Sequence, residues 1–153
     1  MTRINLVVPK ELTDQHLKAE IRELPRIFSL MLKKSKNKTI NFPTSYKLGT
    51  GHVIFFYNKL QWLHHRYLEL LAEAKERKFK VDERIVESYL TKIETLSKTS
   101  YYNNWSFNSF ELGLSRERLK EKIDMKPMFY KYYKKPLIQS YFSNYPRYSS
   151  HSS

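Results

Sequence analysis

Two glutamates three residues apart are the first candidates for chemistry in this chain. Glu20 and Glu23 fall in one predicted helix, where Glu20 points into the apolar face and Glu23 lies at the border of a basic face. Arg22 and Arg26 flank Glu23. A glutamate between arginines most often forms a simple ion pair, yet a single acid among phosphate-binding cations is also what sugar chemistry in DNA requires. The residues leave both interpretations open.

The residue content argues against several other kinds of reactive centre. The chain has no cysteine, which excludes disulfides, thiolate metal sites and thiol nucleophiles. His16, His52 and the pair His64–His65 are scattered without metal-ligand spacing, and we interpret His52 as a hydrogen-bonded turn residue. The three glycines cannot make a nucleotide-binding loop. We therefore expect neither a metal nor a cofactor.

The positive charge of the chain is large and unevenly distributed. The net charge is +13, and 11 of these charges come from two stretches, residues 22–48 (seven basic, one acidic) and residues 126–153 (five basic, none acidic). Such a balance implies an anionic partner. No run approaches the roughly 18 apolar residues of a membrane span, and the N-terminus lacks the apolar core of a signal peptide. We expect a soluble, intracellular protein that binds nucleic acid rather than a membrane.

A row of polar and basic side chains follows the exposed face of the predicted first helix. Its members are Gln15, Lys18, Arg22, Arg26 and Lys33. Basic residues on an exposed face are commonly just solvated. Here further lysines continue the row and the acids lie elsewhere, so phosphate binding with counterion release is the favoured interpretation.

Aromatic rings alternate with cations near the C-terminus. The segment from Phe129 to Lys135 contains Tyr130, Lys131, Tyr132 and Tyr133. A groove that follows a nucleic-acid backbone needs this combination, because rings pack against sugars or bases while cations meet phosphates. The alternative, a core-packing segment with solvated lysines, has equal weight on the sequence alone.

The helix that would position these residues is predicted over Thr13–Ser35. Apolar residues recur at steps of four and three, and Thr13 is a suitable N-cap. Pro25 lies inside the pattern and should kink the helix, since it removes one backbone hydrogen bond.

Three further helices are predicted. The second starts near Asn58, which can cap it with Gln61, and ends near Arg77. A third covers 83–97 with Ile85, Tyr89, Ile93 and Leu96 inward, and a loop follows over Tyr101–Phe110. The last helix begins at Ser115, carries Leu119 and Ile123 inward, and stops at Pro127.

The predicted fold is all-α. At 153 residues the chain is too short for two ordinary domains, and no segment shows the alternation of a strand. We expect one compact domain over residues 1–139. The Ser- and Tyr-rich segment 140–153 is expected to be a flexible tail.

Several sequence blocks resemble the bacteriophage-type pyrimidine-dimer DNA glycosylases, also called phage-type endonuclease V. The blocks keep the family's order over residues 1 to about 135 and are Met1–Leu6, Asp14–Leu17, Ala19–Glu20, Arg22–Arg26, Leu48–Gly49, Gly51–Val53, Phe55–Tyr57, Arg118–Leu119, Glu121–Ile123 and Tyr130–Tyr133. The chain departs from the family at Ile21, where relatives can have Tyr, and at Phe129, where they have Trp. These departures concern lesion preference rather than chemistry.

The resemblance implies a compact helical monomer whose N-terminal segment packs between helices. Thr2, exposed when Met1 is removed, corresponds to the nucleophile, and Glu23 to the catalytic acid. The matching DNA-contacting residues are Arg3, Gln15, Arg22, Arg26, Arg118 and Lys122. The implied substrate is double-stranded DNA with ultraviolet-induced pyrimidine dimers or abasic sites, in a bacterial cytoplasm, a nucleus or a viral factory. The implied reaction has two steps. A glycosylase step removes the base and forms an imine with the enzyme, and an abasic-site lyase step then cleaves the strand by β-elimination.

Two interpretations from another class remain. One is a non-catalytic basic helical module that binds DNA or RNA, and the other is a structural RNA-binding protein of ribosomal type. Both would tolerate any residue at Thr2 and Glu23, which the enzyme would not.

Overall fold

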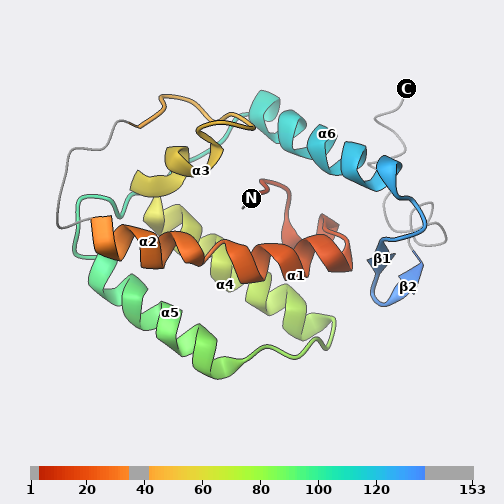
Figure 1. Cartoon of the computed structure of the whole chain (residues 1–153), viewed down its shortest axis with the longest axis horizontal. Coiled ribbons are helices and arrows are strands. Elements are labelled where there is room, and N and C mark those ends of the chain that lie inside the picture. Colours follow the sequence, from red (N-terminus) through yellow and green to blue (C-terminus); the bar gives the residue numbers. More distant parts are fainter. Residues whose placement is uncertain (1–3, 35–41, 137–153) are drawn as a thin grey trace. The chain divides into compact units, whose positions relative to one another are not determined.

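The computed structural model describes residues 4–34 and 42–136, which are predominantly helical (Figure 1). The predicted all-α class is confirmed, while the expected domain end at residue 139 and the tail lie outside the described residues. No described helix is long and apolar enough to cross a membrane. The elements are a 3-10 turn (Pro9–Glu11), α1 (Asp14–Glu23), α2 (Arg26–Lys34), α3 (His52–Phe55), a second 3-10 turn (Phe56–Asn58), α4 (Leu60–Glu76), α5 (Glu83–Leu96), α6 (Ser109–Met125), β1 (Lys131–Tyr132) and β2 (Lys135–Pro136).

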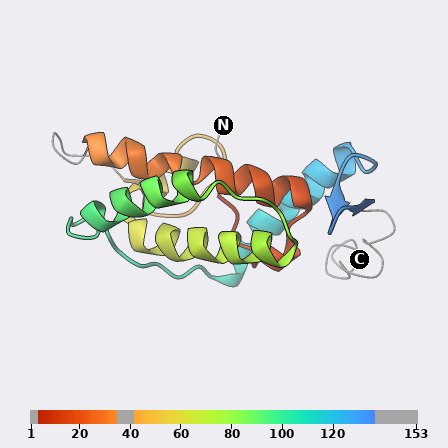
Figure 2. The same cartoon turned by 90° about the horizontal axis from the view of Figure 1, so that it is seen from below.

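The chain divides into two compact units, of which the first comprises Met1–Ile4 and Glu20–Ser106. In this unit α2 packs along α5, and α4 also contacts α5 (Figure 2). Phe28 of α2 and Tyr67 of α4 are fully buried and meet edge to face, with ring centroids 6.4 Å apart. Burial raises the pKa of the Tyr67 phenol to about 12. Large apolar side chains therefore hold the helices of this unit together.

Pro25 ends one helix and lets the next begin. The expected helix over Thr13–Ser35 is divided at Leu24–Pro25 into α1 and α2, so the predicted kink is a full break. Pro25 has no N–H to donate, and the N–H groups of Ile27 and Phe28 bond three residues back, to Leu24 and Pro25. Thr13 is the expected N-cap: its hydroxyl accepts the N–H of His16 at 3.1 Å.

The prediction that Asn58 caps α4 is wrong. Asn58 lies in the preceding 3-10 turn, and its side-chain oxygen accepts Lys59 Nζ at 2.9 Å. The N–H of Leu60 instead donates to the carbonyl of Tyr101 at 3.1 Å. A distant loop thus satisfies an orphan donor of this helix. The predicted end at Arg77 is confirmed.

α5 confirms the third predicted helix with one correction. Its N-cap is Asp82, whose carboxylate accepts the N–H groups of Arg84 and Ile85. Ile93 and Leu96 are buried as predicted, but Ile85 is 53% exposed. Ile85, in the first turn of α5, therefore lies outside the apolar core that buries Ile93 and Leu96.

The second unit comprises Asn5–Ala19 and Phe107–Ser153, and α6 is its longest helix. α6 begins at Ser109 rather than at the predicted Ser115, because Asn108 and Glu111 form a reciprocal capping box. Ser115 is a buried residue of the helix, and its hydroxyl accepts the N–H of Leu6 at 3.0 Å. The predicted end before Pro127 is confirmed.

A two-stranded hairpin follows α6, although the sequence predicted no strand. β1 and β2 are antiparallel, with Tyr132 opposite Lys135. Tyr133 and Lys134 form the connection with positive φ values of 51° and 68°. Such short strands carry no alternation pattern, and the turn lacks the glycine or asparagine that usually marks it.

Candidate active site and nucleic-acid interface

The structure separates the two glutamates of α1. Glu20 is buried, and its carboxylate pairs with Arg66 in two bonds, Oε2 to Nε at 2.8 Å and Oε1 to Nη2 at 3.1 Å. The Glu23 side chain is 23% exposed, and within the described part of the chain its one ion pair is with Arg22 Nη2 at 3.4 Å. A pair of this length on a largely exposed arginine contributes little. Glu20 therefore has a structural role in the core, whereas the Glu23 side chain is partly accessible to solvent.

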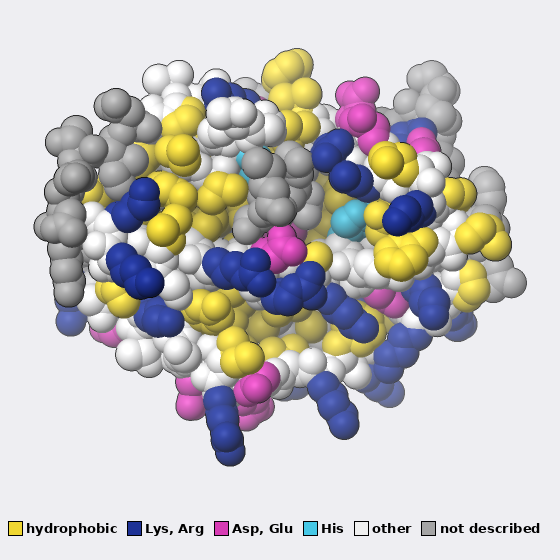
Figure 3. All heavy atoms as spheres, viewed as in Figure 1, with side chains coloured by type: hydrophobic (Ala, Val, Ile, Leu, Met, Phe, Trp, Pro, Cys, Tyr) yellow, Lys and Arg dark blue, Asp and Glu magenta, His cyan; other side chains and the backbone are white. Residues whose placement is uncertain are grey.

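Exposed cations lie beside Glu23 and along α2 in the first unit. Arg22 and Arg26 are exposed at the junction of α1 and α2, and Lys33 and Lys34 are exposed at the end of α2. Figure 3 shows basic side chains gathered over these elements. The apolar residues of α2 turn inward, so the cations lie on its free side. Such a surface is suited to phosphate oxygens.

The N-terminal segment enters the first unit at Ile4. Ile4 is fully buried, its N–H donates to His52 Nε2 at 2.7 Å, and its carbonyl accepts the Tyr46 hydroxyl at 3.4 Å. Thr2 and Arg3, the residues expected to react and to contact DNA, lie outside the described residues. The described structure therefore begins at Ile4, the point to which Thr2 and Arg3 are attached.

A glycine turn presents His52. Gly49 and Gly51 have φ values of 78° and 85°, and the N–H of His52 donates to the carbonyl of Gly49 at 3.0 Å. His52 Nδ1 lies 2.9 Å from the Lys47 carbonyl oxygen. The prediction that His52 is hydrogen-bonded is confirmed, but His52 follows the glycine turn as the first residue of α3. Its bond to Ile4 was not indicated by the sequence.

In the second unit, Gln15 holds the segment before the hairpin. Its Nε2 donates to the carbonyl of Phe129 at 2.7 Å, and its Oε1 accepts the N–H of Lys131 at 2.9 Å. The Gln15 amide therefore has a structural role in the free protein. Lys131 itself is exposed.

Asp14, the first residue of α1, binds the hairpin turn. Its carboxylate accepts the N–H of Tyr133 at 2.9 Å and that of Lys134 at 2.6 Å. These are the two residues with positive φ. A charged acceptor compensates a backbone conformation that is costly for residues other than glycine.

Two tyrosines of the hairpin segment pack inward. Tyr130 stacks on His16, with ring centroids 4.7 Å apart, and the Tyr132 hydroxyl donates to the carbonyl of Lys10 at 3.1 Å. Both rings are at least nine-tenths buried, and burial raises the pKa of the Tyr130 phenol. A contact of these two rings with DNA stays a prediction.

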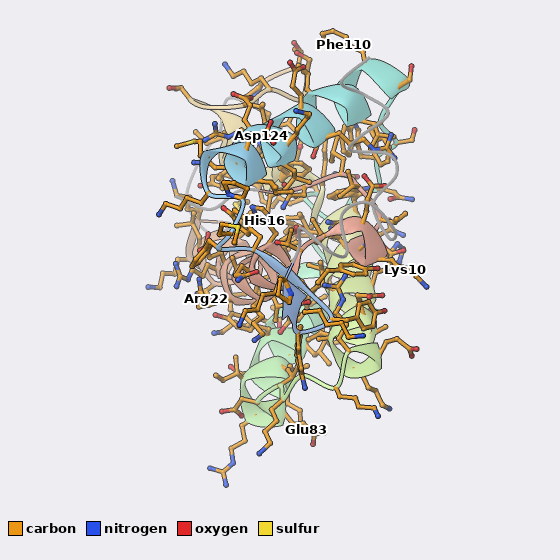
Figure 4. All side chains as sticks on the ribbon, turned by 90° about the vertical axis from the view of Figure 1, so that its right-hand side faces the viewer. Lys10, His16, Arg22, Glu83, Phe110 and Asp124 are labelled. Atoms are coloured by element: carbon orange, nitrogen blue, oxygen red, sulfur yellow. The ribbon has the colours of Figure 1, made fainter. Side chains whose placement is uncertain are left out.

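His16 is a neutral histidine in a basic neighbourhood. Burial, and then the nearby Lys122 ammonium, lower its pKa to about 4. In Figure 4, His16 lies on the side of α1 next to the part of α6 that carries Asp124. Thr13 Oγ1 is 2.7 Å from its Nδ1. The ring therefore acts as an uncharged support for Tyr130 at physiological pH.

α6 contributes the two remaining basic candidates. Arg118 and Lys122 are four residues apart and both half-buried, so they lie on one face of the helix. Arg118 Nε is a buried donor with no hydrogen-bond partner in the described part of the chain. An unpartnered guanidinium N–H is costly unless an acceptor arrives.

The predicted site residues thus fall into two sets. The first unit contains Arg22, Glu23 and Arg26, and the second contains Gln15, Arg118, Lys122 and the segment Tyr130–Tyr133. Sequence reasoning missed Asp14, because its partners lie about 120 residues away. Among residues 4–34 and 42–136, no group of three or more His, Cys, Asp or Glu is arranged to hold a metal ion.

The sequence also matches a known family. The model of the pyrimidine dimer DNA glycosylase family matches residues 1–86, more than half of the chain. The chain belongs to this family. Its substrate is therefore DNA, and its reaction is the cleavage of the glycosidic bond between base and sugar at pyrimidine dimers.

Proposed function

We propose that this glycosylase excises cyclobutane pyrimidine dimers through an imine with the α-amine of Thr2, and then nicks the strand as an abasic-site lyase. The observation that carries the proposal is the contrast between the two glutamates: Glu20 is buried against Arg66, while Glu23 stays accessible among cations. A carboxylate in that position can act on a sugar held by its phosphates.

The α-amine suits this chemistry because of its basicity. Its reference pKa is about 7.7–8.0, against about 10.4 for a lysine, so more of it is uncharged at neutral pH. Its lone pair forms a bond to C1′ as the glycosidic C1′–N bond breaks. The base leaves with the electron pair and takes up a proton, the amine loses one, and ring opening gives the imine.

Strand cleavage follows from the imine. Removal of a C2′ proton pushes electrons towards C3′, and the 3′ phosphate leaves in a β-elimination. Water then hydrolyses the imine and frees the amine. We assign Glu23 the stabilisation of the developing positive charge on the sugar and the proton transfers near C1′ and C2′.

Binding of the duplex falls to the basic residues of both units. Arg22 and Arg26 are exposed for phosphate contacts beside Glu23. Arg118, Lys122 and Lys131 supply further cations, and Arg3 is expected to contribute from outside the described residues. We propose that a monomer kinks the duplex and flips a nucleotide, which costs least where damage has weakened pairing. Salt-sensitive binding supports sliding between lesions.

Replacing Glu23 tests the proposal. Glu23→Gln should bind dimer-containing DNA within about twofold of the wild type but excise about a hundredfold or more slowly, because the carboxylate acts in the transition state. Glu69→Gln, at an exposed position of α4, is the matched control and should behave as the wild type. Equal losses of binding and excision in Glu23→Gln would contradict the role.

A further inference from the structure

Ile4 is held at both of its backbone polar groups by buried rings. Its N–H donates to His52 Nε2 at 2.7 Å, and its carbonyl accepts the Tyr46 hydroxyl at 3.4 Å. The exposed fractions are 0% for Ile4 and His52 and 4% for Tyr46. Thr2 lies two residues before Ile4 in the sequence. The proposed nucleophile is thus attached to a fixed point.

The hydrogen bonds of His52 define its proton position. Nδ1 lies 2.9 Å from the Lys47 carbonyl oxygen, which can only accept, so Nδ1 carries the proton. Nε2 is then a lone-pair acceptor directed at the N–H of Ile4. Tyr46 and Phe56 meet the imidazole edge to face at 5.5 and 5.7 Å between centroids. These two rings pack against the imidazole in the orientation that its hydrogen bonds define.

The turn that carries His52 favours glycine at position 51. A Cβ atom at Gly51 would lie 2.6 Å from Lys47 Cε, and the φ of 85° is unfavourable for any other residue. The same turn provides the Lys47 carbonyl that orients the ring. The acceptor for Ile4 is therefore a side-chain nitrogen whose ring is oriented by a backbone carbonyl of the first unit.

We propose that His52 is a positioning residue for the N-terminal α-amine, acting through Ile4. The inference rests on the proposed function, in which that amine is the nucleophile. Two residues span at most about 7 Å, so a fixed Ile4 limits where the amine can go. Attack on C1′ needs an approach of about 3–3.5 Å, and misplacement by about 1 Å can cost a hundredfold.

Two substitutions at His52 distinguish the effect of its hydrogen-bond acceptor from the effect of its side-chain volume. His52→Met fills similar space without a nitrogen or oxygen acceptor, and His52→Gln retains a carbonyl oxygen that can reach the N–H of Ile4. Single-turnover borohydride trapping on an abasic-site duplex measures imine formation, and fluorescence anisotropy measures affinity. His52→Met should trap about ten- to a hundredfold more slowly with an unchanged dissociation constant. His52→Gln should recover most of the rate.

Asn103→Ala is the matched control. It removes two hydrogen bonds from the same unit, to the Asn58 and Ser100 carbonyls, without touching Ile4. The thermal midpoints of all variants are measured, and trapping is done well below the lowest. Asn103→Ala should trap at the wild-type rate. Equal slowing of Asn103→Ala and His52→Met would mean a general structural effect and overturn the inference.

The wild-type result distinguishes a failure of the positioning role of His52 from a failure of the proposed function. If the wild type forms a reduced adduct on its N-terminal peptide and His52→Met traps equally fast, the positioning role is wrong and the proposed function stands. If the wild type forms no adduct there, the proposed function fails and the positioning role with it.

Discussion

The side-chain oxygen of Gln15 accepts the backbone N–H of Lys131 at 2.9 Å, across 116 residues of sequence. The same amide donates to the carbonyl of Phe129 at 2.7 Å. Gln15 therefore fixes the backbone that leads into the basic hairpin, before any DNA is bound.

Gln15→Ala should lower the free energy of unfolding of the DNA-free protein by about 1–2 kcal/mol, since two hydrogen bonds are lost. The amide of Lys131 should also exchange its hydrogen faster. Chemical denaturation and hydrogen exchange measure the two effects. Unchanged stability and exchange would mean that Gln15 has no structural role in the free protein.

His16 makes stability depend on pH. Its pKa is lowered from 6.5 to about 4 by burial and then by Lys122. Above pH 6.5 the ring is neutral in both states. Between about 6.5 and 4 the unfolded chain takes up a proton that the folded chain does not, so the free energy of unfolding falls as the pH falls, by about 3 kcal/mol in total. Below about 4 this contribution no longer changes.

His16→Phe isolates that contribution. The variant keeps a ring against Tyr130 but cannot titrate. Urea denaturation between pH 7 and 4 should show a smaller loss of stability than in the wild type. Parallel pH profiles for the two proteins would contradict a lowered pKa at His16.

The pair Glu20–Arg66 is a structural counterpart to Glu23. Arg66→Met should cost about 3–5 kcal/mol of unfolding free energy, because it removes the guanidinium that pairs with the buried Glu20 carboxylate. The double variant Glu20→Leu with Arg66→Met should recover most of this loss, and it should still excise dimers. Failure of the folded double variant to excise would move the catalytic role to Glu20.

The cations beside Glu23 should set the salt dependence of binding. Arg22→Ala and Arg26→Ala should each weaken binding to all duplexes and lower the slope of log K against log salt by about one. Lys75→Ala, at an exposed position near the end of α4, should leave the slope unchanged. A wild-type slope in both arginine variants would mean that these two residues are solvated and do not contact phosphates.

Local patterns were sufficient for much of the fold. Apolar spacing predicted α4, α5 and the segment that forms α1 and α2, although it predicted that segment as one kinked helix. It failed at the start of α6, where Phe110 is 72% exposed and the first turn carries no apolar signal. The Asn108–Glu111 capping box starts that helix instead.

The long-range contacts that assemble the site could not be predicted from local sequence patterns. Wheel geometry correctly placed Glu20 in the core and Glu23 at the border. In contrast, the bonds of Asp14 to the hairpin and of His52 to Ile4 join residues 48 to 120 positions apart. Hydrogen bonds over such separations depend on tertiary packing and leave no spacing signal in a single sequence.

The most direct measurement is mass spectrometry of the protein after borohydride reduction on dimer-containing DNA. The DNA remnant should lie on the N-terminal peptide, at the nitrogen of Thr2. Thr2→Ser should stay active because the hydroxyl does not react, whereas acetylating the amine or adding a residue before Thr2 should abolish excision. An adduct on a lysine such as Lys131, or full-rate excision by the acetylated protein, would contradict the N-terminal amine as the nucleophile.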